Sequence, residues 1–379
     1  MNPSPRRVRI ETGARLHFGL LARGPTAPRH HGGLGMMIDQ PGLVLTAETI
    51  ASPHPTPTPP HARTHAEAAP FHVIVEALAS AALPQPSGFG SCAPDDLNVW
   101  AARLDATARR VVRTAGLPLA GVRLRLERAP IPHIGLGSGT QLGLAVACAL
   151  ATLSGLDPSG IGVATLARWS GRGLRSGVGA HGFEHGGLIV DGGHPNLCDG
   201  DRPETDRFPT IAPLLSRLVP SDNWRVILAR PERLASGRHG QDEADTFARL
   251  PPIPRSQTDA WCGLVLLELL PAIVEGDLPR FGAALSRLQR EVGDSFATEQ
   301  AGGAWAGVES HRLAKRLEAL GLVGVGQSSW GPTLYGFTTA DSSIAQLDDS
   351  ALADALGLPT GWAMRTRPLN QGARVIIEA

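Results

Sequence analysis

The stretch Pro130-Ile131-Pro132-His133-Ile134-Gly135-Leu136-Gly137-Ser138-Gly139-Thr140-Gln141 decides the fold of this chain. It follows an alternating segment, 121–127 (GVRLRLE), which is typical of a half-buried strand, and it opens into an apolar run at 142–153 that predicts a helix. The glycines let the backbone curl, so that successive N–H groups can converge on an anion at the start of the helix. The order strand, glycine-rich loop, helix therefore predicts a phosphate-binding loop.

The loop matches neither G-x-x-x-x-G-K-[ST] nor G-x-G-x-x-G, so it is neither a Walker loop nor a dinucleotide-binding turn. The hydroxyl groups of Ser138 and Thr140 are further donors to a phosphate and candidate ligands of Mg²⁺. The alternative is a glycine-rich turn that binds nothing.

Composition indicates a globular protein of about two domains. The chain has 379 residues, of which 42% are hydrophobic and 18% charged. The 35 basic and 35 acidic residues cancel, which argues against nucleic acid as a partner. The longest apolar stretch, 142–156, is shorter than the roughly 20 residues that span a bilayer. With Glu11, Arg15 and His17 interrupting the N-terminal stretch, we expect a cytoplasmic protein without membrane contact.

Periodicity predicts an α+β fold of two domains, each a largely antiparallel sheet packed with helices. A composition break at 192–221 separates domains expected at 1–200 and 221–379, and the Pro- and His-rich segment 51–70 is expected to be an exposed insertion loop. Strands are expected at 6–18, 43–50, 121–127, 224–230 and on both sides of a glycine-rich loop within 322–338. Helices are expected at 95–115, 142–153, 258–275, 277–292 and 308–320.

Three blocks in the same order resemble the GHMP kinase superfamily. They are the loop described above, the segment 171–179 (GRGLRSGVG) with Gly186-Gly187, and 324–332 (GVGQSSWGP). In kinases of that superfamily an Asp after S-G-V is the usual base for the accepting hydroxyl, whereas this chain has Gly179. A glycine cannot accept a proton, so the phosphate loop is present while the ordinary kinase base is missing.

The details are similar to the β-ribofuranosylaminobenzene 5′-phosphate synthase family of the same superfamily, which serves methanopterin biosynthesis. The resemblance covers about residues 9–376 and includes ARLHFGL (14–20), HGGLG (31–35), RSG (175–177), FEHGG (183–187) and NQGAR (370–374). It implies a pentosyltransferase that joins phosphoribosyl pyrophosphate to 4-aminobenzoate or 4-hydroxybenzoate and releases CO₂ and pyrophosphate. It also implies Mg²⁺ and a homodimer.

The resemblance assigns roles to named residues. Catalytic candidates are Arg15, His17, Glu184 and His185, and Glu184 with Asp191 are candidate Mg²⁺ ligands. Substrate and phosphate contacts are expected from Gly135, Gly137, Ser138, Gly139, Thr140, Arg172, Arg175, Ser176, Gln327, Ser328, Ser329, Trp330 and Arg374.

Plainer interpretations stay open at several of these positions. Arg15 and Arg374 could bind a substrate carboxylate or form surface ion pairs. His17 could be a buried core residue, and Trp330 could serve only to pack the C-terminal domain. The string 181–185 (HGFEH) matches the H-x-x-E-H zinc motif, yet its flanking glycines argue against the helix that the motif requires. A kinase using another carboxylate and a non-catalytic ligand sensor are the alternative functions.

Overall fold

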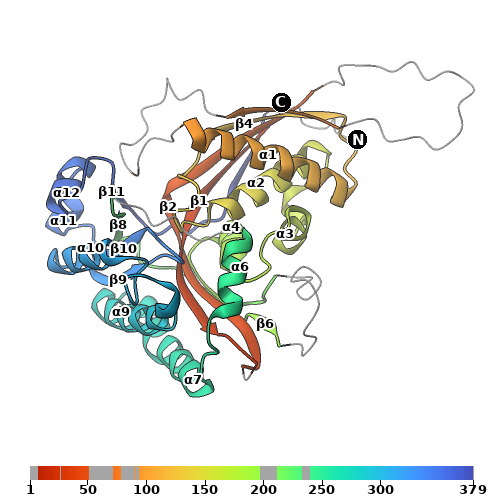
Figure 1. The fold of residues 1–379 in the computed structure, drawn as a ribbon. Coiled ribbons are helices and arrows are strands. Elements are labelled where there is room, and N and C mark those ends of the chain that lie inside the picture. Colours follow the sequence, from red (N-terminus) through yellow and green to blue (C-terminus); the bar gives the residue numbers. More distant parts are fainter. Residues whose placement is uncertain are drawn as a thin grey trace, which may run out of the picture.

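The computed structural model describes residues 7–25, 27–50, 71–77, 89, 94–196, 211–232 and 240–378. Within these ranges the chain forms two sheets with helices packed against them (Figure 1), which confirms the expected α+β class. The insertion loop expected at 51–70 lies outside the described residues.

The first sheet is built around a long antiparallel hairpin, β1 (Arg7–Ala22) and β2 (Arg29–Thr49). Its strand order is β12-β1-β2-β4-β3, and β5 and β6 pair with β2 while β7 pairs with β5. Among the described strands only the β3–β4 pair is parallel. The other members are β3 (His72–Ala77), β4 (Gly121–Arg128), β5 (Leu188–Asp191), β6 (His194–Pro195), β7 (Leu214–Leu218) and β12 (Arg374–Glu378).

Strand β2 is longer than the segment 43–50 that the sequence predicts, because it begins at Arg29. The glycines at 33 and 35 belong to this strand rather than to a loop. Gly35 pairs with His17 on one side and with Ile189 on the other, and a Cβ at Gly33 would collide with the side chains of Ser176 and Asp191. These glycines let neighbouring groups approach the strand closely.

Four helices accompany this sheet: α1 (Pro94–Ala115), α2 (Ser138–Leu153), α3 (Val163–Ser170) and α4 (Val178–His185). Helix α2 is buried along nearly its whole length, which explains its apolar, small-residue sequence. It begins at Ser138, four residues before the expected start, so the end of the glycine-rich loop forms its first turn.

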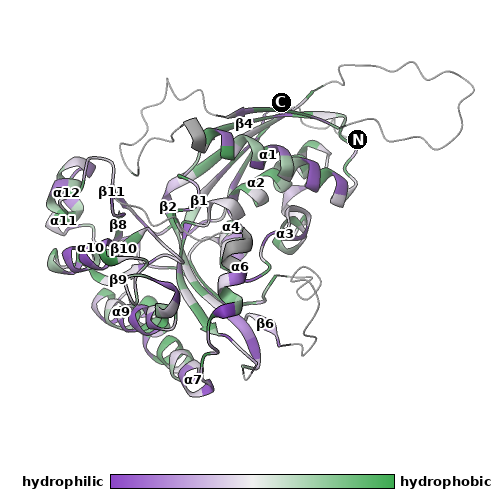
Figure 2. Cartoon of the chain, viewed as in Figure 1, coloured by the Kyte–Doolittle hydropathy of each residue, from purple (hydrophilic) through white to green (hydrophobic). Residues whose placement is uncertain are grey.

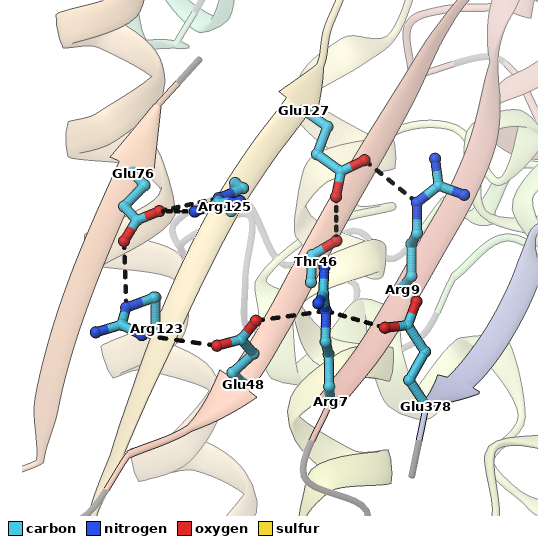
Figure 3. Close-up of polar contacts among 9 residues, drawn as sticks. All are labelled: Arg7, Arg9, Thr46, Glu48, Glu76, Arg123, Arg125, Glu127 and Glu378. Carbon is cyan, nitrogen blue, oxygen red and sulfur yellow. Dashed lines mark hydrogen bonds and ion pairs between the residues drawn. The ribbon is translucent and has the colours of Figure 1, made fainter. Parts of the chain in front are cut away.

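The other face of the sheet is polar. Alternate residues of β1 lie on opposite faces of the sheet. Val8 and Ile10 are buried in the core with α2, while Arg7 pairs with Glu48 of β2 and Arg9 pairs with Glu127 of β4. Figure 3 shows these ion pairs running across β3, β4, β2, β1 and β12. We interpret this row as the solvated face of the sheet.

The second sheet is antiparallel, with the order β11-β8-β10-β9. Its strands are β8 (Trp224–Ala229), β9 (Val323–Gln327), β10 (Leu334–Thr339) and β11 (Ala363–Thr366). The helices of this half are α6 (Gly240–Arg249), α7 (Arg255–Leu264), α8 (Leu270–Glu275), α9 (Leu278–Asp294), α10 (Val308–Ala319), α11 (Ser343–Gln346) and α12 (Asp349–Ala355). Hydrophilic and hydrophobic residues alternate around α1 and α10 in Figure 2, as in amphipathic helices.

Helices α7 and α8 are joined by a π-helical turn, Val265–Leu269, into one apolar run of 21 residues, Arg255–Glu275. By length and composition alone this run is sufficient to cross a membrane, a feature that the sequence analysis did not single out. Its Trp261, Leu264 and Leu269 are buried in the core of the molecule, whereas Leu266, Leu267 and Val274 are exposed.

The two sheets meet along β1. Phe18 packs with Tyr335 and Phe337 of β10, at ring-centroid distances of 5.3 and 6.3 Å. Strand β12 at the end of the chain returns to pair with β1 in the first sheet. The junction therefore brings residues from both halves to the same place, beside the start of α2.

Candidate active site

The glycine-rich loop turns sharply before α2. Gly137 caps the helix with φ 69°, and Gly135 has φ 85°. The N–H groups of Thr140 and Gln141 donate to the carbonyl of Gly137, while Ser138 and Gly139 supply the first N–H groups of the helix. A helix start of this kind favours an anion through its N–H groups and its dipole.

Arginine side chains gather around this helix start. A Cβ built on Gly139 would lie 3.6 Å from Nη1 of Arg172 and 3.8 Å from Nη1 of Arg103, and one built on Gly137 would lie 2.9 Å from Cγ of Arg15. Burial lowers the pKa of Arg172, and the nearby charges of Arg103 and Arg110 lower it further. Within the described part of the chain, Arg103, Arg110 and Arg172 form no ion pair. Mutually repelling guanidinium groups without carboxylates favour binding of a multiply charged anion.

A cavity of about 330 Å³ opens beside this cluster. One wall comes from Arg15 and His17 of β1, Thr140 of α2 and the segment 171–176. The other wall comes from α6, α9, the segment between α9 and α10, the end of β9 and the β9–β10 loop. Its residues are Phe247, Gln289, Val292, Gly293, Phe296, Gln300, Ala304, Trp305, Gln327, Ser329 and Trp330. The cavity therefore has a cationic wall and a wall rich in aromatic rings.

The aromatic wall is a packed cluster. Trp330 contacts Phe296 and Phe247 edge to face, at centroid distances of 4.9 and 5.5 Å. The guanidinium of Arg175 lies 5.3 Å from the centre of the Phe247 ring. A flat aromatic ligand can pack here with a cation close by.

His17 is hydrogen-bonded to residues of both halves of the chain. Its main-chain N–H donates to Ser328 Oγ (3.1 Å), and its Nε2 lies 3.3 Å from Ser176 Oγ. Ser176 in turn donates to Asp191 Oδ2 (3.0 Å). Burial lowers the pKa of His17 well below its usual value, and the charges of Arg15 and His31 lower it further. His17 is consequently a neutral imidazole at physiological pH.

Several predicted contacts support the cavity rather than line it. Ser328 is fully buried, and its hydroxyl donates to the carbonyl of Gly135 (2.7 Å), so it ties the β9–β10 loop to the phosphate loop. Ser138 is buried as well, whereas Thr140, Ser329 and Trp330 do line the cavity. Gln327 reaches its wall while accepting a hydrogen bond from the N–H of Ala306.

Glu184 and His185 are not brought to the cavity. The Glu184 carboxylate pairs with His185 (3.1 Å) and accepts the N–H of Val163 (3.3 Å) at the start of α3, and both side chains are half exposed. The catalytic roles expected of these two residues therefore need correction: they lie at the end of α4, outside the cavity lining.

The expected Mg²⁺ site on Glu184 and Asp191 does not form either. Asp191 is buried, and its two oxygens already accept four hydrogen bonds, from Gly33, Gly177, Gly193 and Ser176. Among the described residues, no group of three or more His, Cys, Asp or Glu side chains is arranged to hold a metal.

Arg374 also lies elsewhere. It belongs to β12, its side chain is 68% exposed, and it forms an ion pair with Glu11 (3.2 Å). The surface ion pair left open in the sequence analysis is thus the arrangement found. The surrounding NQGAR segment packs against the FEHGG segment, since the N–H of Ala373 donates to Phe183 and a Cβ at Gly372 would collide with the Glu184 main chain. Close packing of the two segments therefore accounts for the NQGAR and FEHGG sequences.

The glycines around 181–185 do not prevent a helix, contrary to expectation, because α4 spans Val178–His185. Gly182 faces Met37 so closely that a Cβ would collide with its sulfur, which explains a small residue at this point of the helix. The H-x-x-E-H string still makes no zinc site, since the His181 Nε2 is hydrogen-bonded to the carbonyl of Ala212 (2.8 Å) and His185 is paired with Glu184.

Gly179 lies directly beside the first turn of α2. A Cβ at this position would have Thr140 and Gln141 as its nearest neighbours, at 3.1 and 3.8 Å, and the carbonyl of Gly179 accepts a hydrogen bond from Gln141. No carboxylate is among its nearest neighbours in the described structure. The position of the kinase base is therefore close to the anion site but carries no proton acceptor.

Several residues around the site were missed in the sequence, among them Arg103, Arg110, Phe247 and Phe296, and His133 was seen as part of the loop but given no role. Arg103 donates to His133 Nε2 (2.6 Å), a residue of the loop itself with φ 62°. The spacing of seven residues between Arg103 and Arg110, which places both on one face of α1, was an available signal. Nothing near 247 or 296 in the sequence connects those rings to the cavity.

Comparisons with known proteins identify the fold and the family of the chain. Residues 101–187 match the family described as GHMP kinases N terminal domain. Homoserine kinase from Cytophaga hutchinsonii superposes with a TM-score of 0.59 at 14% identity, covering 99% of this chain and 98% of that one. Mevalonate diphosphate decarboxylase from Staphylococcus aureus superposes with a TM-score of 0.55 at 11% identity, and the match covers 98% of each chain. At these identities the likeness shows the fold.

Sequence relatives carry one name, beta-ribofuranosylphenol 5'-phosphate synthase. The protein from Methanothermobacter thermautotrophicus is 32% identical over 260 residues, 64% of this chain and 70% of that protein. The protein from Methanocaldococcus jannaschii is 27% identical over 379 residues, and the match covers 97% of this chain and 99% of that protein. The match to the Archaeoglobus fulgidus protein, 37% over 211 residues, spans 55% of this chain and 62% of that relative, less than two thirds of its length.

The fold and the family match together define a protein with the GHMP kinase fold, in which Gly179 lies beside the start of α2. Within that class, the chain belongs to the beta-ribofuranosylphenol 5'-phosphate synthase family. It is an enzyme of that family, as the sequence blocks predicted.

Proposed function

We propose that the protein joins phosphoribosyl pyrophosphate to a para-substituted benzoate, 4-hydroxybenzoate or 4-aminobenzoate, with release of pyrophosphate and CO₂. The product is a C-riboside 5′-phosphate of the kind required for methanopterin. One observation carries this proposal: the anion site at the start of α2 opens into an aromatic-lined cavity, and Gly179 leaves that site without a kinase base.

The diphosphate is assigned to the cationic wall. As it leaves C1 of the ribose, negative charge grows on its oxygens, and the N–H groups at the start of α2 with Arg15 and Arg172 are oriented to stabilise that charge. Arg103 adds a further guanidinium at Gly139. Because these donors are already in place, little reorganisation accompanies departure of the leaving group.

The benzoate is assigned to the aromatic wall, where Trp330, Phe296 and Phe247 form a surface for its ring and the positive charge of Arg175, next to Phe247, attracts its carboxylate. Holding the ring carbon in line with C1 of the ribose is the main task of this wall. In the best model systems, holding two reactants in the correct position lowers the activation barrier by roughly 7–11 kcal/mol.

We also propose that the diphosphate enters as its magnesium complex. The described residues that line the cavity include no carboxylate, so a Mg²⁺ ligand set made by the protein does not fit here. The ion is therefore treated as part of the substrate.

The protein is further proposed to act in the cytoplasm as a homodimer, without nucleic acid or membrane as partner. Exposed apolar side chains of Leu266, Leu267 and Val274, 64–74% accessible, lie on the α7–α8 run and offer a surface that a second copy would cover.

Purified protein tests the proposal. Incubation with phosphoribosyl pyrophosphate, Mg²⁺ and 4-hydroxybenzoate or 4-aminobenzoate is expected to yield a C-riboside 5′-phosphate, identified by its mass. ATP with a panel of small alcohols serves as the kinase control and is expected to give no turnover. ATP consumption without any riboside product would contradict the proposed function.

A further inference from the structure

The orientation of the His17 ring is set by a chain of hydrogen bonds that ends at Asp191. His17 is 7% exposed, and its Nε2 lies 3.3 Å from Ser176 Oγ. Ser176 Oγ lies 3.0 Å from Asp191 Oδ2 and also accepts the N–H of Val178 at 3.2 Å. The direction of each bond decides which ring nitrogen of His17 carries the proton.

Asp191 determines the direction of the first bond. The carboxyl group is 1% exposed and accepts main-chain N–H groups from Gly33 (2.8 Å) and Gly193 (2.9 Å) on Oδ1 and from Gly177 (2.8 Å) on Oδ2. All four hydrogen bonds to it come from donors, and a carboxylate has no proton of its own to donate, so it can only accept. The single hydroxyl proton of Ser176 must therefore point to Asp191.

Because the Ser176 proton is used in this way, its oxygen can only accept from His17. Nε2 of His17 then carries the ring proton and Nδ1 carries the lone pair. The ring stays neutral because burial, Arg15 on the same strand and His31 on β2 all lower its pKa. Among the described residues, the side chains hydrogen-bonded to His17 are those of the uncharged Ser176 and Ser328. No described residue is hydrogen-bonded to Nδ1, and His17 lines the cavity.

We propose that Ser176 and Asp191 are positioning residues that fix His17 as the Nε2–H tautomer, so that Nδ1 accepts a hydrogen bond from the para hydroxyl or amino group of the aromatic substrate. This inference rests on the proposed function for the identity of that substrate.

The lone pair on Nδ1 selects among the groups that the two substrates present. It repels the oxygens of phosphate and carboxylate, which the arginines bind, and it attracts an O–H or N–H donor. In the proposed reaction, drawing the para proton toward Nδ1 pushes electron density to the ring carbon that bears the carboxylate. That carbon forms the bond to ribose C1 as pyrophosphate leaves with the C–O electron pair. Loss of CO₂ returns its bonding pair to the ring, and the para proton returns from Nδ1.

Nitrogen NMR of protein labelled with ¹⁵N-histidine tests the tautomer without any substrate or variant of Ser176, once His17→Gln has assigned the His17 signals. We expect the wild-type ring to show a protonated Nε2 and an unprotonated Nδ1 at pH 7. A protonated Nδ1 would overturn the proposal, whatever the activity of the enzyme.

Variants and a substrate analogue test the role in recognition. 4-Fluorobenzoate matches 4-hydroxybenzoate in size but has no donor, and wild type is expected to bind it about tenfold more weakly. In Ser176→Ala that preference should shrink toward unity and kcat should fall, with KM for phosphoribosyl pyrophosphate nearly unchanged. Ser176→Thr keeps the hydroxyl and is expected to restore the preference. Ser154→Ala is the control, since its Oγ bonds Leu150 at the far end of α2.

The outcomes separate this inference from the proposed function. An enzyme that forms the riboside but shows the same preference in wild type and Ser176→Ala contradicts the inference alone. A rise in KM for phosphoribosyl pyrophosphate in Ser176→Ala, without a change in the benzoate preference, assigns Nδ1 to the ribose and also overturns it. Absence of any riboside product contradicts the proposed function, while the NMR result still decides the tautomer.

Discussion

At the scale of single residues, the site depends on the buried positive charge of Arg172. Arg172 is mostly buried, its Nε has no hydrogen-bond partner among the described residues, and its nearest charges are other arginines. Such a group is costly in the free protein, and an anion that binds it removes that cost.

Arg172→Gln and Arg103→Gln are therefore expected to weaken binding of inorganic pyrophosphate by about 1.5–3 kcal/mol each, the value of a charge-assisted hydrogen bond. Isothermal titration calorimetry measures the change. Arg113→Gln is the matched control, since Arg113 is an exposed arginine in the last turn of the same helix as Arg103. Equal losses in all three variants would show that only overall charge matters.

His31 provides a prediction for stability. Burial and the neighbouring positive groups lower its pKa from 6.5 to about 3 in the folded protein. Between these values the unfolded chain binds a proton that the folded chain does not, so stability falls as pH falls from about 6.5, by up to about 1.4 kcal/mol for each pH unit.

His31→Asn removes this contribution without straining the backbone, because φ at this position is 71° and Asn tolerates the left-handed region. Urea unfolding between pH 4.5 and 7.5 is expected to show a weaker pH dependence in His31→Asn than in wild type. The exposed His311→Asn should leave the dependence unchanged. Identical curves for wild type and His31→Asn would contradict the burial argument.

At the scale of elements, the loop before α2 and the β9–β10 loop act as one unit. Gly135 has φ 85°, and a Cβ there would collide with the carbonyl of Ser328, whose hydroxyl donates to the carbonyl of Gly135. The geometry of the anion site therefore depends on contact between the two halves of the chain.

Gly135→Ala is expected to lower the free energy of unfolding by more than the roughly 1–2 kcal/mol that a left-handed non-glycine residue costs, and to weaken pyrophosphate binding. Gly116→Ala is the control: its φ is 63°, but nothing lies within 4 Å of the added Cβ. Urea denaturation and calorimetry measure both effects. If the two variants lose the same stability and Gly135→Ala binds pyrophosphate normally, the loops are not coupled.

The same elements show how far the sequence alone could lead. Strict alternation at 121–127 and the small, apolar run at 142–153 predicted β4 and α2, because local periodicity dominates in both. Helix α4 was rejected for its glycines, yet tertiary packing of Gly182 on Met37 favours it. The start of β2 at Arg29 was missed because only pairing with β1 and β5 makes its glycines part of a strand.

At the scale of the whole molecule, the cavity exists only because two sheets meet along β1. Arg15, His17 and Thr140 come from the first half, and Phe247, Phe296 and Trp330 come from the second. Motifs in the sequence identified the first set and Trp330, but the arrangement of Phe247 and Phe296 depends on packing across the junction. Glu184, His185 and Arg374 were assigned to the site by resemblance, and the structure places them at packing contacts and surface ion pairs instead.

The most direct test of the central claim is a parallel time course of pyrophosphate and CO₂ release from phosphoribosyl pyrophosphate and carboxyl-labelled 4-hydroxybenzoate. If one cavity holds both reactants, we expect equal amounts of pyrophosphate and CO₂ at every time point. We expect neither product when one substrate is omitted. Pyrophosphate released at the same rate without the benzoate would contradict the claim that a single site brings the diphosphate and the aromatic ring together.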